Sequence, residues 1–558
     1  NLRVFYGGDE LFTPVIDHSQ EKIVEIATTK MHELYTSNPP EYVLKRLEKE
    51  LNSITSNGFD VIYLIAMELV KRSNKRGYIV GSRGSVGSSF VATMLGISNV
   101  NPLKPHWRCP NNDFVTFETP KEVENGYDLP DLNCPNCGAK CSKEGMDIPF
   151  ETFLGFNGDK VPDIDLNFAG EDQGFAQKDV RELFGEDFAY KAGTIMTVAD
   201  RSALQMAKNY FVDNKQNINS AYAEYLADQL IGTKISTGTH AGGVIVIPQY
   251  KGVFDFTPFQ YPAGDKTSDW KTTHFDFHSI HDNVLKLDIL GHDDPRMIKE
   301  LERLTQYDNE SIDLSDSNIP LVFSNNAINA YGLEITPTGL PEFGTDLTQK
   351  MLQKTQPKTV SDLFRISGLS HGTDVWAGNS EDLIDQGIAT LKEVVACRDD
   401  IKYGVPEKEA FNIMESARKG MYAKGKKSKA EPVALMKEHG VPDWYIESVM
   451  KIMYLFPKGH AVAYTINAMK IAWWKINYPN AFTAAWLTTK GEQFDTGSFT
   501  LSAEEINAQI GRLKREILSS RTNADVKKKL VKSLTIQLDA LKSGVTFKPV
   551  SLENSSAS

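Results

Sequence analysis

Two carboxylates, Asp163 and Asp165, flank one apolar residue in the segment Pro162-Asp-Ile-Asp-Leu-Asn-Phe168. If this segment is a β-strand, alternate residues share a face, so both carboxylates lie on the side opposite Ile164 and Leu166. Adjacent like charges are unfavourable unless a cation lies between them. Carboxylate oxygens suit Mg²⁺, and a pair of such ions can stabilise both oxygens of a phosphoryl transfer. The pattern predicts a magnesium site, and an exposed strand edge with two ordinary acids is the alternative.

Asp288 is a candidate third acid, because it interrupts an apolar, strand-like run from Leu285 to Leu290. A buried carboxylate is strongly unfavourable unless it is paired or bound to a metal. Asp288 therefore either joins the metal site or faces water on a surface strand. Asp276, in His274-Phe-Asp-Phe-His278, competes for the same role on the same argument.

A loop rich in glycine and serine follows a predicted strand at Tyr78–Val80 and precedes a predicted helix at Phe90–Leu95. Glycines let backbone N–H groups turn toward one point, and hydroxyls, a guanidinium and a helix N-terminus all favour phosphate oxygens. The loop lacks the Gly-Lys-Ser/Thr ending of a Walker A motif, and a flexible linker is the alternative. The predicted phosphate-binding residues are Gly81, Ser82, Arg83, Gly84, Ser85, Gly87 and Ser88.

Four of the five cysteines lie between residues 109 and 141. Cys134-Pro-Asn-Cys137, with Cys109 upstream, has the spacing of a zinc ribbon. Cys141, His106 or Asp113 could supply the fourth ligand, and we take the set as Cys109, Cys134, Cys137 and Cys141. Four protein ligands would make the Zn²⁺ structural, and a reduced, metal-free loop is the alternative. Cys397 is most simply a small buried residue.

Basic residues form two clusters, one of them Arg418, Lys419, Lys424, Lys426, Lys427 and Lys429, and the other within residues 512–532. Either could follow a nucleic-acid backbone. The glycine and serine among residues 424–429 favour an exposed loop there. Arg418 and Lys419 follow an apolar helical pattern and are the better candidates. For Trp473 and Trp474 the helical spacing favours core packing over base stacking.

The elements that position these residues belong to a chain of 558 residues with a net charge of −12, 41% apolar and 24% charged residues. This composition excludes wholesale disorder, collagen and coiled coil, and the length indicates three or four domains. No apolar run approaches the ~18 residues of a membrane helix, so we expect a cytoplasmic protein without a membrane partner.

Helical spacing covers residues 40–70, 175–231 and 292–545, whereas residues 150–168 and 232–291 have strand-like composition. Residues 102–145 are dense in Pro, Asn and Cys and indicate an inserted loop or metal knuckle. The predicted fold class is α+β, a mixed sheet interrupted twice and followed by a large helical domain.

Six motifs occur in an order that resembles the C-family replicative DNA polymerases of bacteria, in the PolC variant of Gram-positive species. They are Gly81–Ser89, Pro162–Phe168, Thr239–Gly243, His274–Asp294, Ser367–Trp376 and Phe456–Tyr464, and the resemblance covers roughly residues 30–555. The family pairs Cys109 with a second cysteine at position 112, where this chain has Asn.

The resemblance implies a nucleotidyltransferase-like, polymerase beta-like palm, an inserted helical thumb, a zinc loop and helical fingers. Asp163, Asp165 and Asp288 would be the catalytic acids that bind two Mg²⁺. The 81–89 loop would hold the triphosphate, with Lys458, His460, Arg365, Arg398, Arg418 and Lys419 as further nucleotide-binding candidates. The implied domains are an N-terminal remnant (1–30), palm (31–169, with a zinc-binding insertion at 104–145), thumb (170–232), palm (233–295), fingers (296–550) and a disordered tail (551–558).

The implied activity is template-directed addition of deoxynucleotides (dNTPs) to a primer 3′-hydroxyl, with release of pyrophosphate and with primer-template DNA as partner. We expect the proofreading and clamp-binding modules to lie outside this chain, and therefore weak duplex binding and low processivity. Two alternatives remain: a catalytically weak core that only binds DNA and dNTPs, and a template-independent nucleotidyltransferase.

Overall fold

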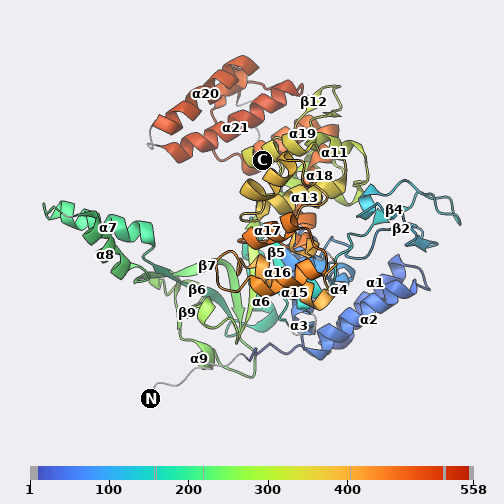
Figure 1. Ribbon diagram of the computed structural model, residues 1–558, viewed down its shortest axis with the longest axis horizontal. Coiled ribbons are helices and arrows are strands. Elements are labelled where there is room, and N and C mark those ends of the chain that lie inside the picture. Colours follow the sequence, from blue (N-terminus) through green and yellow to red (C-terminus); the bar gives the residue numbers. More distant parts are fainter. Residues whose placement is uncertain are drawn as a thin grey trace. The chain divides into compact units, whose positions relative to one another are not determined.

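The computed structural model describes residues 10–155, 158, 160–217, 219–401, 404–519 and 523–551. The chain divides into two compact units, the first formed by Asn1–His18 and Asp172–Gly291 and the second by Ser19–Glu171 and His292–Ser558. Strands and helices occur in both units, so the α+β class predicted from the sequence is confirmed (Figure 1). Among the described helices, none combines the length and the apolar character needed to cross a bilayer.

The first unit is built on a mixed sheet in the order β10-β7-β6-β9-β8. All neighbours are antiparallel except β6 and β9, which are parallel. The longest strands, β6 and β7, lead to the packed helices α7 and α8, drawn in green in Figure 1. The elements are α6 (Gln173–Phe184), β6 (Ala189–Thr197), α7 (Asp200–Asp213), α8 (Ser220–Leu230), β7 (Lys234–Val246), α9 (Val253–Phe256), β8 (Phe259–Gln260), β9 (Thr272–Asp276) and β10 (Leu285–His292).

The second unit is mainly helical and packs around α18, of which 15 of 20 residues are buried. A helix that is apolar on most sides belongs in a core. Trp474 is fully buried there and Trp473 is half-buried against the same core, so the predicted core packing is confirmed in full for Trp474 and in part for Trp473. Its helices are α1 (Ser19–Leu34), α2 (Glu41–Ser56), α3 (Asp60–Lys75), α4 (Phe90–Met94), α5 (Glu151–Leu154), α10 (Asp293–Thr305), α11 (Asn318–Phe323), α12 (Asp346–Thr355), α13 (Val360–His371), α14 (Glu381–Asp385), α15 (Glu407–Arg418), α16 (Ala430–Glu438), α17 (Asp443–Lys451), α18 (Lys458–Asn477), α19 (Pro479–Lys490), α20 (Ala503–Ser519) and α21 (Ala524–Lys542).

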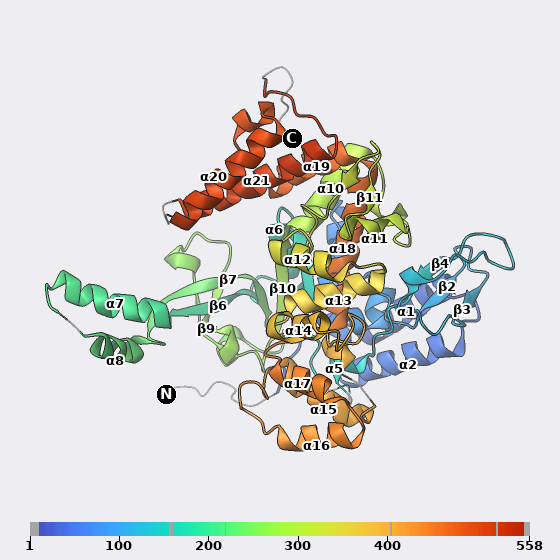
Figure 2. The same ribbon diagram turned by 45° about the horizontal axis from the view of Figure 1, so that its top comes forward.

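The described strands of the second unit form three hydrogen-bonded groups. One is the ladder of β1 (Gly81–Arg83) with β5 (Asp165–Ala169), and another joins β2 (His106–Arg108), β3 (Val115–Thr116) and β4 (Ser142–Glu144). The third pairs β11 (Ala327–Ile328) with β12 (Glu334–Ile335). Figure 2 shows β2, β3 and β4 together near α1, and α20 beside α21.

Four local predictions need correction. The strand predicted at Tyr78–Val80 begins at Gly81, within the segment expected to be a loop, and the strand-like region 150–168 begins with helix α5. The helical region 175–231 contains the long strand β6. Residue 30, where the first segment was expected to end, lies inside α1. Of the tail expected to be disordered, residues 552–558 lie outside the described part.

Candidate active site

The carboxylate pair lies at the start of β5 in the second unit. Asp165 is the first residue of the strand, and Asp163 lies two residues before it. Ile164 and Leu166 are buried whereas both acids keep solvent contact, which is the predicted alternation. One carboxylate oxygen of Asp163 lies within 4.8 Å of one of Asp165. Two oxygens bound to one Mg²⁺ are at most about 4.2 Å apart, so small side-chain adjustments would allow this pair to share an ion.

The glycine–serine loop begins beside this pair, because Arg83 of β1 is opposite Asp165 in the β1–β5 ladder. After β1 the chain turns into a 3-10 helix, Gly84–Ser88, which leads directly into α4. Gly84 has a φ of +79°, and a Cβ added there would lie 3.5 Å from Asp165 Oδ2. The turn toward the carboxylates therefore requires glycine. The side chain of Arg83 is outside the described part of the structure.

The serine hydroxyls of the loop mainly hold it in place. Ser82 Oγ donates to Ser98 Oγ at 3.0 Å, and the buried Ser88 Oγ accepts from Thr152 Oγ1 at 2.9 Å. Both hydroxyls were expected to bind phosphate. Their protein partners show that they also have a structural use, which leaves Ser85, half-buried on the loop, as the more accessible hydroxyl.

A buried ion pair between Arg46 and Glu50 holds the end of the loop that leads into α4. Glu50 is fully buried, and its Oε2 accepts from Ser89 Oγ and from the backbone N–H of Val91, both at 3.0 Å. Arg46 contacts Glu50 at 2.5 Å and donates to the backbone carbonyl of Ser88 at 2.8 Å. The pair thus joins helix α2 to the end of the loop and to the start of α4. Sequence analysis did not single out either residue.

The N-terminus of α18 packs directly on the loop. A Cβ on Gly87 would lie 3.1 Å from the Cα of Gly459, so the two backbones touch. The backbone N–H of Gly84 donates to His460 Nδ1 at 3.2 Å. His460 was predicted to bind nucleotide. The structure places it against the loop and among aromatic rings, 4.6 Å from the ring centre of Tyr464.

His371, on α13, lies next to this group, with its ring 5.1 Å from that of His460. Its Nε2 is 2.9 Å from Glu342 Oε2, and its Nδ1 is 2.6 Å from the backbone carbonyl of Ser367. Burial lowers the pKa of His371, but the hydrogen bond and charge of Glu342 outweigh burial and leave the pKa raised. His371 lies in the Ser367–Trp376 motif, although its type and spacing alone did not mark it.

Several cations gather elsewhere in the second unit with few acids to balance them. Burial, together with repulsion from Arg398 and Arg418, lowers the pKa of Lys160 to about 8, although its side chain keeps solvent contact. Lys419 adds to the repulsion, and Glu415 is the nearby acid that opposes it. Closely placed like charges are unfavourable without an anion. Sequence analysis found three of these four cations and missed Lys160.

Arg398 is 3% exposed, and burial lowers its pKa. One of its terminal nitrogens donates to the backbone carbonyl of Thr152, while its Nε has no hydrogen-bond partner among the described residues. Arg418 instead makes a bidentate pair with Glu415, at 2.5 and 2.6 Å. The Nε of Arg398 is 3.9 Å from Asp399 Oδ2, an ion-pair distance that is too long for a hydrogen bond.

The remaining two nucleotide-binding candidates line a small cavity of about 30 Å³. Arg365 is held by Glu124 at 3.3 Å and by Asp400 at 3.9 Å. Lys458 donates its backbone N–H to Asp399 at 2.7 Å, at the first turn of α18. The structure therefore gives Arg365 acidic protein partners, and it places Lys458 at the helix end that packs on the loop.

Asp288 lies on β10 in the first unit, and its Oδ2 pairs with Lys286 at 2.9 Å. Its Oδ1 is buried without a hydrogen-bond partner among the described residues. Such an atom is expected to have a ligand. Asp276, the competing acid, has backbone partners for both carboxylate oxygens. They accept hydrogen bonds from the backbone N–H groups of Ile195 and His278, both at 2.9 Å.

The cysteine-rich segment forms two facing turns beside the sheet of β2, β3 and β4. One ligand atom from each of Cys109, Asp113, Cys134 and Cys137 lies within 4.8 Å of the others. The backbone N–H of Asn111 and its side-chain amide donate to the sulfurs of Cys109 and Cys137, both at 3.4 Å. A cluster of thiols that accepts N–H bonds fits a structural zinc, which is bound as thiolate.

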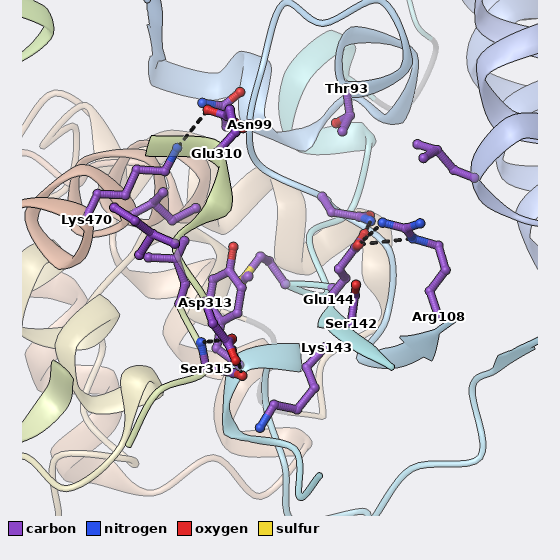
Figure 3. Close-up of a pocket in the computed structure, with 18 of the residues that line it drawn as sticks. Thr93, Asn99, Arg108, Ser142, Lys143, Glu144, Glu310, Asp313, Ser315 and Lys470 are labelled. Carbon is purple, nitrogen blue, oxygen red and sulfur yellow. Dashed lines mark hydrogen bonds and ion pairs between the residues drawn. The ribbon is translucent and has the colours of Figure 1, made fainter. Parts of the chain in front are cut away.

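A cavity of about 560 Å³ lies between the cysteine-rich segment and residues 309–315 (Figure 3). Its charged side chains already have protein partners: Arg108 pairs with Glu144, and Lys470 pairs with Glu310. The cavity contains none of the candidate catalytic acids, so its size does not mark it as the active site.

Comparison with known proteins gives one consistent family. Residues 21–220 and 206–291 match the bacterial DNA polymerase III alpha NTPase domain, and residues 294–440 match the bacterial DNA polymerase III alpha subunit finger domain. The chain is 47% identical over 98% of its length to the PolC-type DNA polymerase III of Lactococcus lactis, and 47% identical over 98% to that of Pediococcus pentosaceus. It spans 34% and 38% of these two relatives, about a third of their length.

Proposed function

Because the chain belongs to the PolC-type DNA polymerase III family, we propose that it is the catalytic core of a template-directed DNA polymerase. In this proposal it adds deoxynucleotides to a primer 3′-hydroxyl and releases pyrophosphate. The observation that carries the proposal is the start of the glycine–serine loop directly beside Asp165. A triphosphate on this loop would present its reacting phosphorus to the carboxylate pair.

The proposed catalytic acids are Asp163, Asp165 and Asp288, the three carboxylates that the resemblance to the family implies. Their donor set is entirely carboxylate oxygen, which is the ligand chemistry of Mg²⁺. When bound, two Mg²⁺ ions would supply charge stabilisation at the attacking and leaving oxygens. The buried, unpartnered Oδ1 of Asp288 supports this assignment over Asp276.

The proposed triphosphate site consists of the loop backbone, the N-terminus of α18 and the cations of the second unit. Lys160, Arg398, Arg418 and Lys419 would stabilise negative charge that increases during the transfer. Burial, and after it repulsion from Arg398 and Arg418, lowers the pKa of Lys160, and a bound polyanion would offset that repulsion, which supports this role. His460 and His371 would position the loop.

In the domain arrangement we propose, the palm carries both carboxylate strands, the thumb includes α7 and α8, and the fingers include α18. The palm is proposed to be nucleotidyltransferase-like. We further propose a structural Zn²⁺ in the cysteine-rich segment. The apolar cluster around Trp107 and Leu129 is small, so a metal would contribute stability that this segment lacks.

The test is single-nucleotide extension on four primer-templates that differ only in the templating base. The proposal predicts that each template selects its complementary dNTP. Extension with the same nucleotide preference on all four templates would identify a template-independent nucleotidyltransferase. Binding of DNA and dNTP without extension would show that this region is only a binding core.

A further inference from the structure

Asn112 occupies the fourth position of the turn that begins at Cys109. Its side chain forms hydrogen bonds with the backbone at the C-terminal end of helix α1. Its Nδ2 donates to the backbone carbonyl of His32 at 2.9 Å, and its Oδ1 accepts from the backbone N–H of Thr36. Its φ of +59° lies in the left-handed region, which asparagine tolerates better than most residues. Both ends of the amide are therefore engaged away from the sulfurs.

Asp113, the next residue, takes the place beside the sulfurs. Its carboxylate lies within 4.8 Å of the thiols of Cys109, Cys134 and Cys137. The side chain of Asn136, from between the two cysteines of the second turn, donates to the backbone carbonyl of Asp113 at 2.8 Å. This bond joins the two turns at the residue that carries the oxygen ligand.

Cys141 lies outside that group of four. It is 3% exposed and packs in the apolar cluster that also contains Cys109 and Cys134. Its backbone N–H donates to the carbonyl of Leu132 at 2.9 Å, and it also lines the large cavity of Figure 3. Burial does not distinguish Cys141 from Cys109 and Cys134, but its sulfur does not lie within 4.8 Å of all four ligand atoms.

We propose that the zinc ligands are Cys109, Cys134, Cys137 and Asp113, and that Cys141 is not a ligand. This inference rests on the structural zinc proposed above and is independent of polymerase activity. Tetrahedral Zn²⁺ accepts three thiolates at about 2.3 Å and one carboxylate oxygen at about 2.0–2.2 Å.

The ligand set can be tested by replacing the metal with Co²⁺ in the full chain and measuring thiolate-to-cobalt charge-transfer absorption, which scales with the number of thiolates. Wild type should bind one Co²⁺ through three thiolates. Asp113→Cys should raise the absorption by about one third, since it supplies a fourth thiolate. Cys141→Ser is the matched control and should leave the spectrum unchanged. Asp113→Ala should weaken metal affinity at least ~10-fold.

Two results would overturn the assignment. If Cys141→Ser lowers the charge-transfer absorption while Asp113→Ala leaves affinity and spectrum unchanged, Cys141 is the fourth ligand. If purified wild type retains no zinc by atomic emission and binds no Co²⁺, the metal site itself is wrong. Neither result depends on primer extension, so failure of the polymerase proposal would be seen separately. If Asp113→Ala does not fold, Asp113→Cys still decides the ligand.

Discussion

The contact between Gly87 and Gly459 is the most direct structural requirement of the proposed triphosphate site. A Cβ on Gly87 would lie 3.1 Å from Gly459 Cα, 3.2 Å from its carbonyl oxygen and 3.3 Å from its carbonyl carbon. All three atoms are backbone, and Gly459 is in the first turn of the buried helix α18. Neither side can rotate away, so in Gly87→Ala the loop must move by a few tenths of an ångström.

Overpacking of this kind costs about 1–3 kcal/mol. If the whole cost falls on the position of the loop, the rate of nucleotide incorporation should fall about 5- to 150-fold, since 1.36 kcal/mol corresponds to a factor of ten. The assay is single-turnover extension of a primer by one nucleotide, with thermal unfolding measured in parallel. Gly459→Ala introduces the same contact from the other side and should have an effect in the same direction.

The matched control is Gly174→Ala, because a Cβ at Gly174 meets nothing within 4 Å. This glycine lies in helix α6, where alanine should be neutral or stabilising. Wild-type incorporation and stability in both Gly87→Ala and Gly459→Ala would refute the reasoning, because they would show that loop and helix are not held in contact.

Three further predictions follow from the same region. Because the pKa of His371 is raised, its ion pair with Glu342 contributes stability that is complete below about pH 6.5 and is lost as pH rises through the raised pKa. His371→Gln should abolish this pH dependence of thermal unfolding. An unchanged pH profile in the variant would contradict the prediction. Anion binding should raise the pKa of Lys160 from about 8. Binding of dNTP to a complex with a 3′-dideoxy primer should therefore take up protons near pH 8.5 in wild type but not in Lys160→Met, as measured by calorimetry in two buffers. Equal heats in wild type and variant would exclude this cation from the site. Glu50→Gln leaves Arg46 without its counter-ion and should lower stability by about 3–5 kcal/mol. Glu41→Gln, which removes a solvent-exposed ion pair, should have little effect. Similar losses of melting temperature in the two variants would contradict the buried-pair argument.

Local patterns predicted the helices around the site well. The apolar spacing of residues 40–70 gave α2 and α3, and the helix at 90–95 is α4 within one residue. Strands whose partners lie far away in the chain were harder to place. Strand β6 pairs with β7 some 40 residues later and has mixed composition, so neighbouring residues carry little information about it.

In the candidate site, too, the residues that are close in sequence could be predicted and those brought together only by folding could not. The D-x-D pair and the loop follow from spacing within a few residues. Lys160 lies near cations from about 240 to 260 positions later in the chain, and only folding brings these charges together. Similarly, Asn112 and Asp113 have separate roles because the end of α1 lies beside the first cysteine turn.

The central claim is that three specific carboxylates support template-directed nucleotide transfer. The most direct measurement is single-turnover extension by wild type and by Asp163→Asn, Asp288→Asn and Asp276→Asn, with DNA affinity measured for each. We predict that Asp163→Asn and Asp288→Asn lose at least ~10²-fold in rate while still binding DNA. Asp276→Asn, which alters a carboxylate that accepts two backbone hydrogen bonds, should stay within about tenfold of wild type. Full activity in Asp163→Asn or Asp288→Asn would contradict the assignment.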